Sequence, residues 1–350
     1  MNNIKDRGAN TEEYWKLRLH RLETMQEKTA SELLTDMRKV YDRAMSDLEK
    51  EIQAFYGRYA SENGLTMQEV HKRLDPKQLK SAREEIKKYY EFADPKQMNP
   101  QMAKAYRDKL RLLSARAYMS RLEEIKMRLE NIMVRLAAKE EEDYTQKLGK
   151  IYSESHSQTS YTIDKTFGFS EGYSAPSNET LNKALQEKWL GRNFSENIWK
   201  NKGRLLDSIQ SDLLSGIALG HNPRKIAEAM EKTMGSGYKN CERLARTETL
   251  HFMNQATFDA YKEHGVEKYE YICGLDERTC LICGELDGKV FELKYAEEGV
   301  NYPVMHPNCR CSTVVAKDDI DRLFESIDKE NVFEVPEKMT YSEWKEKNSK

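Results

Sequence analysis

The chain has 350 residues, of which 33% are charged and 38% hydrophobic, and its formal net charge is −2. No apolar stretch approaches the length of a membrane-spanning helix, so we expect no membrane association. Basic and acidic side chains number 57 and 59, a balance too even for a dedicated nucleic-acid surface. The high charge, with few Gly and Pro, favours long solvent-exposed helices.

The N-terminal part predicts two long amphipathic helices. From Thr11 to the stop at Asn63-Gly64, apolar residues recur mostly every three or four positions, which places them on one helical stripe. Pro-containing breaks follow, and a second stripe runs from Tyr106 to Leu136. We expect a long-helix domain over residues 1–152, folded as an antiparallel hairpin or bundle. Its stripes form either an ordinary core or, in part, a surface buried against a partner.

Residues 153–180 are rich in Ser, Thr and Gly, and this composition predicts a linker. Shorter helices follow. One ends at Gly220, and the next begins at Asn222-Pro223 and stops at Gly235-Ser236-Gly237, where a third begins and continues to Gly265. We therefore expect a second domain over residues 181–316. Residues 317–350 should form a C-terminal tail, with a helix and a loosely held terminus.

Short strands are predicted after Gly265. Tyr269, Tyr271 and Cys273 alternate with charged or β-branched neighbours, and residues 289–291 and 313–315 are further candidates. The fold class expected for the whole chain is mainly α, with a small α+β C-terminal module.

Five possible soft-metal ligands lie in one window of this module: Cys280, Cys283, His306, Cys309 and Cys311. A Cys-x-x-Cys pair followed at a distance by a His/Cys cluster is typical of one structural zinc ion, Zn²⁺. Four ligands fill such a site, and the spacing leaves the choice between Cys309 and Cys311 open. Reduced structural thiols and disulfides are the alternatives. Because residues 1–10 are polar, we expect no signal peptide and a reducing compartment, which disfavours disulfides.

Four motifs together resemble the phage Mu F-like family, the minor head proteins of tailed bacteriophages. They are A-R-T-E-T at 245–249, D-E-R-T-C-L-I-C at 276–283, L-D-G-K-V-F at 286–291 and H-P-N-C-R-C at 306–311. Their order and spacing agree with the family over residues 181–315. The stretch W-L-G-R-N-F-S at 189–195 is similar to the form found in phages of Gram-positive hosts.

The resemblance implies a structural protein of the phage head, without catalytic residues or a small-molecule substrate. Its expected partners are the portal protein, other procapsid components and, at passage of the genome, DNA. We expect assembly in the bacterial host cytoplasm and a final location in the virion. Some relatives carry a toxin domain after the motifs, and the 39 residues after Cys311 are too few for one.

A polar cluster is expected beside the metal: Arg246, Thr247, Glu248, Asp276 and Arg278. Arg246 either forms an exposed i,i+4 pair with Glu242 or is half-buried and bonded, with Glu248, to the metal-tied segment. Asp276 and Arg278 flank the first cysteine pair and should orient its turn.

Three other functions compete with the head protein. A metal nuclease would need paired His or Asp groups, whereas His251 and His264 lie on a helix without such a partner. An ADP-ribosyltransferase would need a Glu-x-Glu pair, which Glu297-Glu298 and Glu325 do not form. A nucleic-acid-binding zinc module would have only Lys289, Lys294 and Arg310 to contact phosphates.

Overall fold

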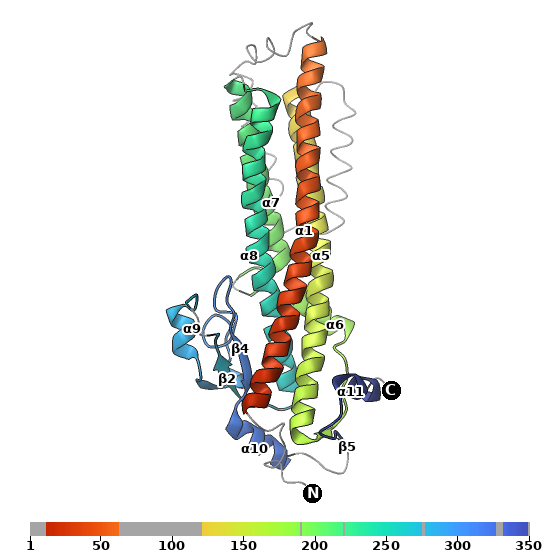
Figure 1. Ribbon diagram of the computed structural model, residues 1–350, viewed down its shortest axis with the longest axis vertical. Coiled ribbons are helices and arrows are strands. Elements are labelled where there is room, and N and C mark those ends of the chain that lie inside the picture. The colour runs from red at the N-terminus through yellow and green to blue at the C-terminus, as the bar shows by residue number, and fades with distance from the viewer. Residues whose placement is uncertain are drawn as a thin grey trace. The chain divides into compact units, whose positions relative to one another are not determined.

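The computed structural model of the chain describes residues 12–62, 121–189, 191–219, 221–274, 277–326 and 332–348. Helices make up most of these residues, and the strands are short (Figure 1). The expected class, mainly α with a small C-terminal module of helices and strands, is confirmed. Among the described helices, none is both long enough and apolar enough to cross a membrane.

The long helices of the described chain are α1 (Glu12–Glu62), α5 (Arg121–Phe167), α7 (Phe194–Ala218) and α8 (Pro223–Glu263). The stripe expected on the first helix is confirmed, because its members Leu33, Met37, Leu48 and Ile52 are fully buried. The expected breaks between residues 63 and 100 lie outside the described residues, as does the first part of the second stripe.

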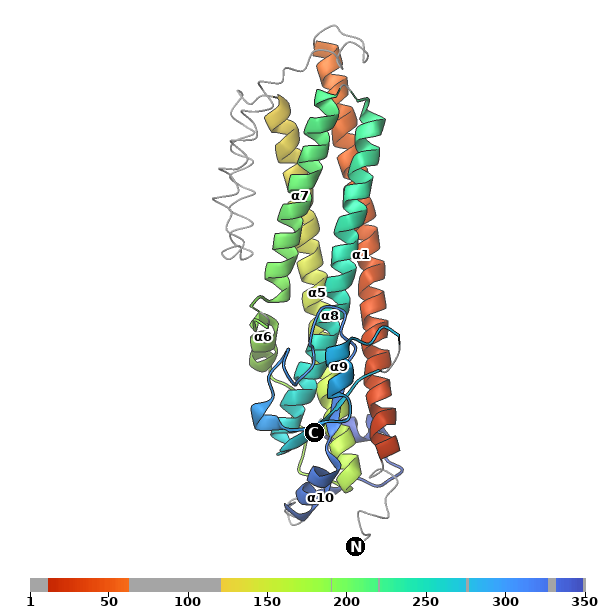
Figure 2. The same ribbon diagram turned by 90° about the vertical axis from the view of Figure 1, so that its left-hand side faces the viewer.

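The helix α8 runs without interruption through Gly235-Ser236-Gly237, so the break expected there is wrong. A Cβ atom added to Gly237 would lie 2.7 Å from Cδ2 of Leu205 on α7. Glycine weakens a helix, but it also permits close approach of a neighbouring side chain. Gly237 therefore allows α7 and α8 to pack closely. Figures 1 and 2 show these two helices side by side.

The linker expected over residues 153–180 is wrong for its first half, because residues 153–167 continue α5 and are mostly buried. Here the hydroxyl groups bond to the helix itself. Ser157 donates to the carbonyl of Ser153 (3.0 Å), and Thr162 and Thr166 donate in the same way one turn back. These bonds satisfy the hydroxyl groups of Ser157, Thr162 and Thr166 inside the helix, so a Ser/Thr-rich composition did not signal a loop.

A three-stranded antiparallel sheet follows α8, in the order β3-β2-β4. Its strands are β2 (Lys268–Ile272), β3 (Val290–Glu292) and β4 (Ser312–Val315), which confirms the three strand predictions. The register pairs Ile272 with Ser312 at one end of the β2–β4 ladder. The short helix α9 (Leu281–Leu286) and the 3₁₀ turn η3 (Leu293–Tyr295) flank β3 in sequence.

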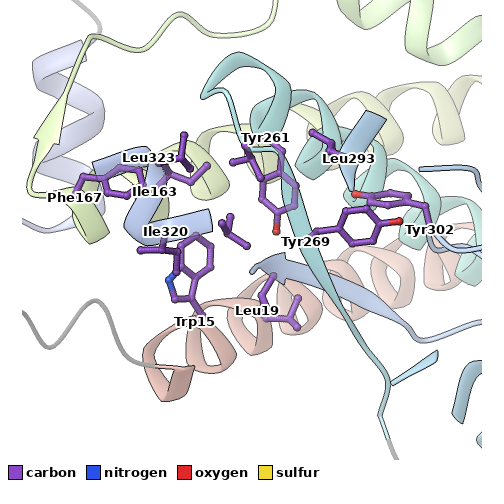
Figure 3. Close-up of a cluster of buried hydrophobic side chains, with 13 residues drawn as sticks. Trp15, Leu19, Ile163, Phe167, Tyr261, Tyr269, Leu293, Tyr302, Ile320 and Leu323 are labelled. Carbon is purple, nitrogen blue, oxygen red and sulfur yellow. The ribbon is translucent and has the colours of Figure 1, made fainter. Parts of the chain in front are cut away.

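The chain separates into two compact units. Unit 1 comprises Met1–Leu33, Tyr144–Asn193 and Arg243–Lys350, and unit 2 comprises Leu34–Asp143 and Phe194–Glu242. This partition differs from the expected series of domains along the chain, because α1, α5 and α8 each contribute residues to both units. Within unit 1, Trp15 and Leu19 of α1 point into the same core as Tyr261 and Tyr269 (Figure 3). The C-terminal module therefore shares its core with the start of the chain.

The C-terminal residues are packed in unit 1. The helix α10 (Lys317–Ser326) follows β4, the strand β5 (Phe333–Glu334) pairs with β1 (Phe169–Ser170), and α11 (Tyr341–Asn348) follows. Trp344 of α11 is fully buried beside Tyr161 and donates its Nε1–H to Oδ2 of Asp164 (2.8 Å). The expected loosely held terminus is therefore wrong for residues 332–348.

Candidate metal centre

The first half of the candidate centre is the turn that begins α9. Cys280 is the N-cap of this helix, and its Sγ accepts the backbone N–H of Cys283 at 3.4 Å. This hydrogen bond lowers the pKa of the Cys280 thiol, because it stabilises the thiolate. Cys283, two residues into the helix, is buried, and burial raises the pKa of its thiol to about 12. The two cysteines therefore face one interior from a single tight turn.

The second half is the turn His306-Pro307-Asn308-Cys309. It is closed by a hydrogen bond from the backbone N–H of Cys309 to the carbonyl of His306 (3.0 Å), with Asn308 in the left-handed conformation (φ 61°). Asparagine adopts that conformation more readily than most residues. Nε2 of His306 lies 3.2 Å from Sγ of Cys280 and 3.4 Å from Sγ of Cys283. The two turns thus bring three donor atoms together.

All five expected ligands converge. They form two overlapping groups, Cys280, Cys283 and His306, and Cys283, Cys309 and Cys311, and in each group the donor atoms lie within 4.8 Å of one another. Cys309 and Cys311 also contact each other, with opposite effects on the pKa of the two thiols. A hydrogen bond from Cys311 lowers the pKa of Cys309 to about 5, while sharing that proton raises the pKa of Cys311.

The donor set fits zinc. In a tetrahedral site with ordinary Zn–S and Zn–N bonds, a sulfur and a nitrogen ligand stand roughly 3.6 Å apart, close to the two S···N distances observed. Nδ1 of His306 lies 3.0 Å from the carbonyl oxygen of Pro307. A zinc-bound histidine commonly donates its other ring N–H to such a group, which orients the ring. The residues present could therefore hold a zinc ion through Cys280, Cys283, His306 and one further thiolate.

Sequence reasoning missed one neighbour of the centre. Sγ of Cys273 lies 3.4 Å from Sγ of Cys311. The expected strand 269–273 already contained Cys273, but the pairing that places it beside Cys311 was not visible without the register of β2 and β4.

The helix α8 positions the ligand-bearing segment through residues spaced seven apart. The backbone N–H of Asn308 donates to Oγ1 of Thr247 (3.0 Å). Nδ2 of Asn254 donates to the carbonyl of Cys311 (3.1 Å), and the hydroxyl of Tyr261 donates to the carbonyl of Thr313 (3.2 Å). Residues seven apart lie on one face of a helix. One face of α8 therefore holds residues 308–313 by their backbone groups.

Of the expected polar cluster, Thr247 is the residue that bonds to the H-P-N-C-R-C turn. Arg246 is exposed, so the half-buried alternative for it is wrong. Arg278 is also exposed, and Asp276 lies outside the described residues. Glu248 is buried, but it faces Trp189 instead of the metal-tied segment: Nε1–H of Trp189 donates to its Oε2 at 3.0 Å. The Arg-Thr-Glu motif thus joins two different neighbours of α8 through its second and third residues.

A buried polar cluster surrounds Glu248. Burial raises the pKa of Glu248 to about 7. The ring of His251 stacks on Trp189, with 4.5 Å between ring centroids, and its Nδ1 lies 2.8 Å from Oε1 of Glu298. Burial alone would lower the pKa of His251, but the carboxylate of Glu298 outweighs it and the net shift is upward. The cluster connects the W-L-G-R-N-F-S stretch, through Trp189, to the A-R-T-E-T motif, through Glu248. The sequence did not predict this contact, because the two residues are 59 positions apart.

Comparisons with known proteins agree with the motifs. The family described as "Phage Mu protein F like protein" matches residues 207–314. An NAD(+)–arginine ADP-ribosyltransferase, EFV, of Enterococcus faecalis is 22% identical over 199 residues, which cover 53% of this chain and 40% of that protein. An uncharacterized protein of Haemophilus influenzae is 23% identical over 122 residues, covering 35% of this chain and 27% of its own length.

The chain therefore spans less than half the length of either curated relative. No solved structure gives a significant match. The matched region contains all of α8, the strands β2 and β3, all of β4 except Val315, and every candidate metal ligand. The resemblance to the phage Mu F-like family, carried by those four motifs, is confirmed over residues 207–314.

Proposed function

We propose that this chain is a minor head protein of a tailed bacteriophage, which associates with the portal vertex and acts in head assembly. The observation that carries the proposal is the convergence of the family motifs on one structural element. Thr247 of A-R-T-E-T holds the H-P-N-C-R-C turn, and that turn meets the Cys-x-x-Cys turn at the candidate metal centre. Three of the motifs are thus joined, one pair through the backbone of Asn308 and the other through side chains, as expected of a scaffold.

The same proposal includes a structural zinc ion bound by Cys280, Cys283, His306 and Cys309. Cys309 is preferred to Cys311 as the fourth ligand because it lies in the same closed turn as His306, whereas Sγ of Cys311 contacts Cys273. Four protein ligands leave no open position for water, so the ion would hold the fold and would not activate a nucleophile.

The zinc proposal is tested on the full chain by elemental analysis, followed by cobalt substitution, which reports the number of thiolate ligands. We expect one metal ion per chain and loss of hydrogen-exchange protection in residues 268–315 after chelation. Cys309→Ser should lower the metal content, while Cys311→Ser should retain it. Metal-free protein that is unchanged by chelation would refute the zinc site. If Cys311→Ser lowers the metal content and Cys309→Ser does not, Cys311 is the fourth ligand.

For the portal-binding surface we propose the helical unit 2. In this unit the apolar residues of α1 and α5, such as Met37, Leu48 and Leu129, are buried, so a partner would meet exposed charged residues. Such interfaces respond to charge reversal and to salt. Arg43, Lys50 and Arg135 are exposed cations on these helices.

The test adds full-length variants to procapsids lacking the native protein and counts incorporated copies by mass spectrometry. Arg43→Glu, Lys50→Glu and Arg135→Glu together should reduce incorporation several-fold. The matched control is Lys183→Glu with Lys188→Glu, a reversal of exposed cations in unit 1. Full incorporation of the first variant with loss in the second would place the binding surface on unit 1. Incorporation of neither wild type nor variants would refute the head assignment.

The match to the Enterococcus enzyme motivates a direct test for a second function, NAD⁺-dependent ADP-ribosylation. We expect purified protein to consume no NAD⁺ in the presence of an arginine-containing substrate. Turnover abolished by Glu248→Ala or Arg246→Ala, in variants that keep their helical content, would replace the structural function by an enzymatic one.

A further inference from the structure

Cys273 and Cys311 occupy opposite positions at the end of the β2–β4 ladder. The last register pair is Ile272 with Ser312, and one further step places Cys273 opposite Cys311. Directly opposite residues on antiparallel strands have Cα atoms about 4.5–5.5 Å apart, which lies inside the range that disulfides span. The two Sγ atoms lie 3.4 Å apart, so the side chains already point toward one another.

The two cysteines also differ in access. Cys311 is buried, with 1% of its surface exposed, whereas Cys273 is partly exposed. Cys273 belongs to neither group of converging metal ligands, and Cys311 differs from Cys309, which shares its group, by the contact with Cys273. With zinc bound by Cys280, Cys283, His306 and Cys309, both thiols of this pair remain unligated.

We propose that Cys273 and Cys311 form a redox-responsive dithiol that closes to a disulfide beside the metal centre. The oxidant is a low-molecular-weight disulfide such as oxidised glutathione. The Cys273 thiolate attacks one sulfur of the oxidant and releases one thiolate, leaving a mixed disulfide on Cys273. The Cys311 thiolate then attacks the Cys273 sulfur and releases the second thiolate. The protein loses two hydrogens, and the oxidant is reduced to two thiols that carry the two protons.

The bond would join the ends of β2 and β4 and enclose residues 274–310, the segment that carries all four proposed zinc ligands. A cross-link around this segment reduces the freedom of the unfolded chain and opposes separation of the two ligand-bearing turns. Oxidation should therefore slow metal release without supplying or removing a ligand. This consequence rests on the zinc site proposed above, whereas formation of the disulfide does not.

The experiment treats zinc-loaded full-length protein with oxidised glutathione and maps the cysteines by non-reducing peptide mass spectrometry, with metal content measured on the same samples. We expect one cross-linked peptide pair, Cys273 with Cys311, unchanged zinc content, and several-fold slower zinc release to a chelator. Cys273→Ser should abolish the cross-link and the slower release while keeping the metal. Cys241→Ser, at a buried cysteine of α8, is the matched control and should cross-link like wild type.

Three results would overturn the proposal. One is a wild-type chain in which Cys273 is alkylated readily yet no Cys273–Cys311 link forms. Another is a link that uses Cys280, Cys283 or Cys309 in protein that still holds its metal. The third is loss of metal on oxidation together with formation of the expected link, which would make Cys311 a ligand. Protein that contains no zinc but forms the link would refute the zinc site alone and leave the dithiol standing.

Discussion

Oγ1 of Thr247 accepts the backbone N–H of Asn308 at 3.0 Å and donates its own proton to the carbonyl of Arg243 at 2.7 Å. The hydroxyl group is thus oriented by a hydrogen bond within α8, and it also anchors the backbone of the turn at Asn308. Asn308 lies between the two candidate ligands His306 and Cys309, so Thr247 fixes the position of this turn relative to α8. Glu248, the next residue of the motif, bonds instead to Trp189.

Replacing Thr247 by valine should destabilise unit 1, because the shape is kept while the N–H of Asn308 loses its acceptor. Asn308 is itself exposed, so the expected loss is the net value of one hydrogen bond, about 1 kcal/mol. Urea denaturation monitored by tryptophan fluorescence measures this loss, and zinc release should accelerate with it. Thr24→Val is the control, since the exposed Thr24 bonds only to the carbonyl of His20 on its own helix. Equal effects of the two variants would contradict the anchoring role of Thr247.

Glu248 should make stability depend on pH. Burial raises its folded-state pKa from 4.5 to about 7, so between these values the folded chain binds more protons than the unfolded chain. Stability contributed at this site is therefore present below about pH 4.5 and falls as pH rises toward 7. Glu248→Gln removes the penalty and keeps an acceptor for Trp189. The variant should gain stability relative to wild type across this window, on the order of a few kcal/mol.

The measurement for Glu248→Gln is the difference in unfolding free energy between variant and wild type at several pH values from 4.5 to 7. Glu231→Gln, at an exposed glutamate of the same helix, is the control for the chemical change itself. A flat difference for Glu248→Gln would mean that this carboxyl is ionised normally in the folded chain.

Gly237→Ala should destabilise unit 2 although alanine favours helices. The added methyl group would lie 2.7 Å from Cδ2 of Leu205, and overpacking of this kind costs about 1–3 kcal/mol. Gly235→Ala, two residues earlier on α8, meets nothing within 4 Å and should stabilise by about 0.5–1 kcal/mol. Thermal unfolding followed by circular dichroism compares the two. Stabilisation by both would show that α7 and α8 are not in close contact at Gly237.

Lys202→Met should be strongly destabilising. Nζ of Lys202 lies 2.5 Å from Oε2 of Glu140, and both side chains are at least 96% buried. Removing one member of a buried ion pair leaves an uncompensated charge and costs about 3–5 kcal/mol. Adding Glu140→Leu should recover much of the loss, whereas Lys139→Met, at an exposed lysine, should change little. Chemical denaturation of the four proteins completes the comparison; no recovery in the double variant would argue that packing around Lys202 dominates.

Periodicity predicted much of this fold. The stripe of α1, the strand β2 and the Cys280–Cys283 turn followed from local spacing, because helices, strands and tight turns fix the positions of residues close in sequence. The convergence of His306 on this turn followed from the ligand spacing typical of a zinc site. The fold class and the ligand window were therefore accessible from the chain alone.

The errors came from tertiary packing. Gly235-Ser236-Gly237 has the composition of a break, yet Gly237 serves a contact with Leu205 that lies 32 residues away in sequence. The Ser/Thr-rich end of α5 has the composition of a loop, yet Ser157, Thr162 and Thr166 donate their hydroxyl protons to carbonyls of the helix itself. Glu248 and Trp189 meet across 59 residues, and no local pattern records that pair.

The core of unit 1 also has a consequence for the order of folding. Trp15 near the start of the chain and Leu323 near its end bury their side chains in the same cluster. Contacts between residues so distant in sequence form slowly, because the intervening chain must first be brought together. A ribosome that has released only the N-terminal helices has not yet made their partners. The ligand-bearing segment accordingly reaches its final packing only after synthesis has passed α10, and a nascent chain stalled before Ile320 should expose Trp15 to solvent.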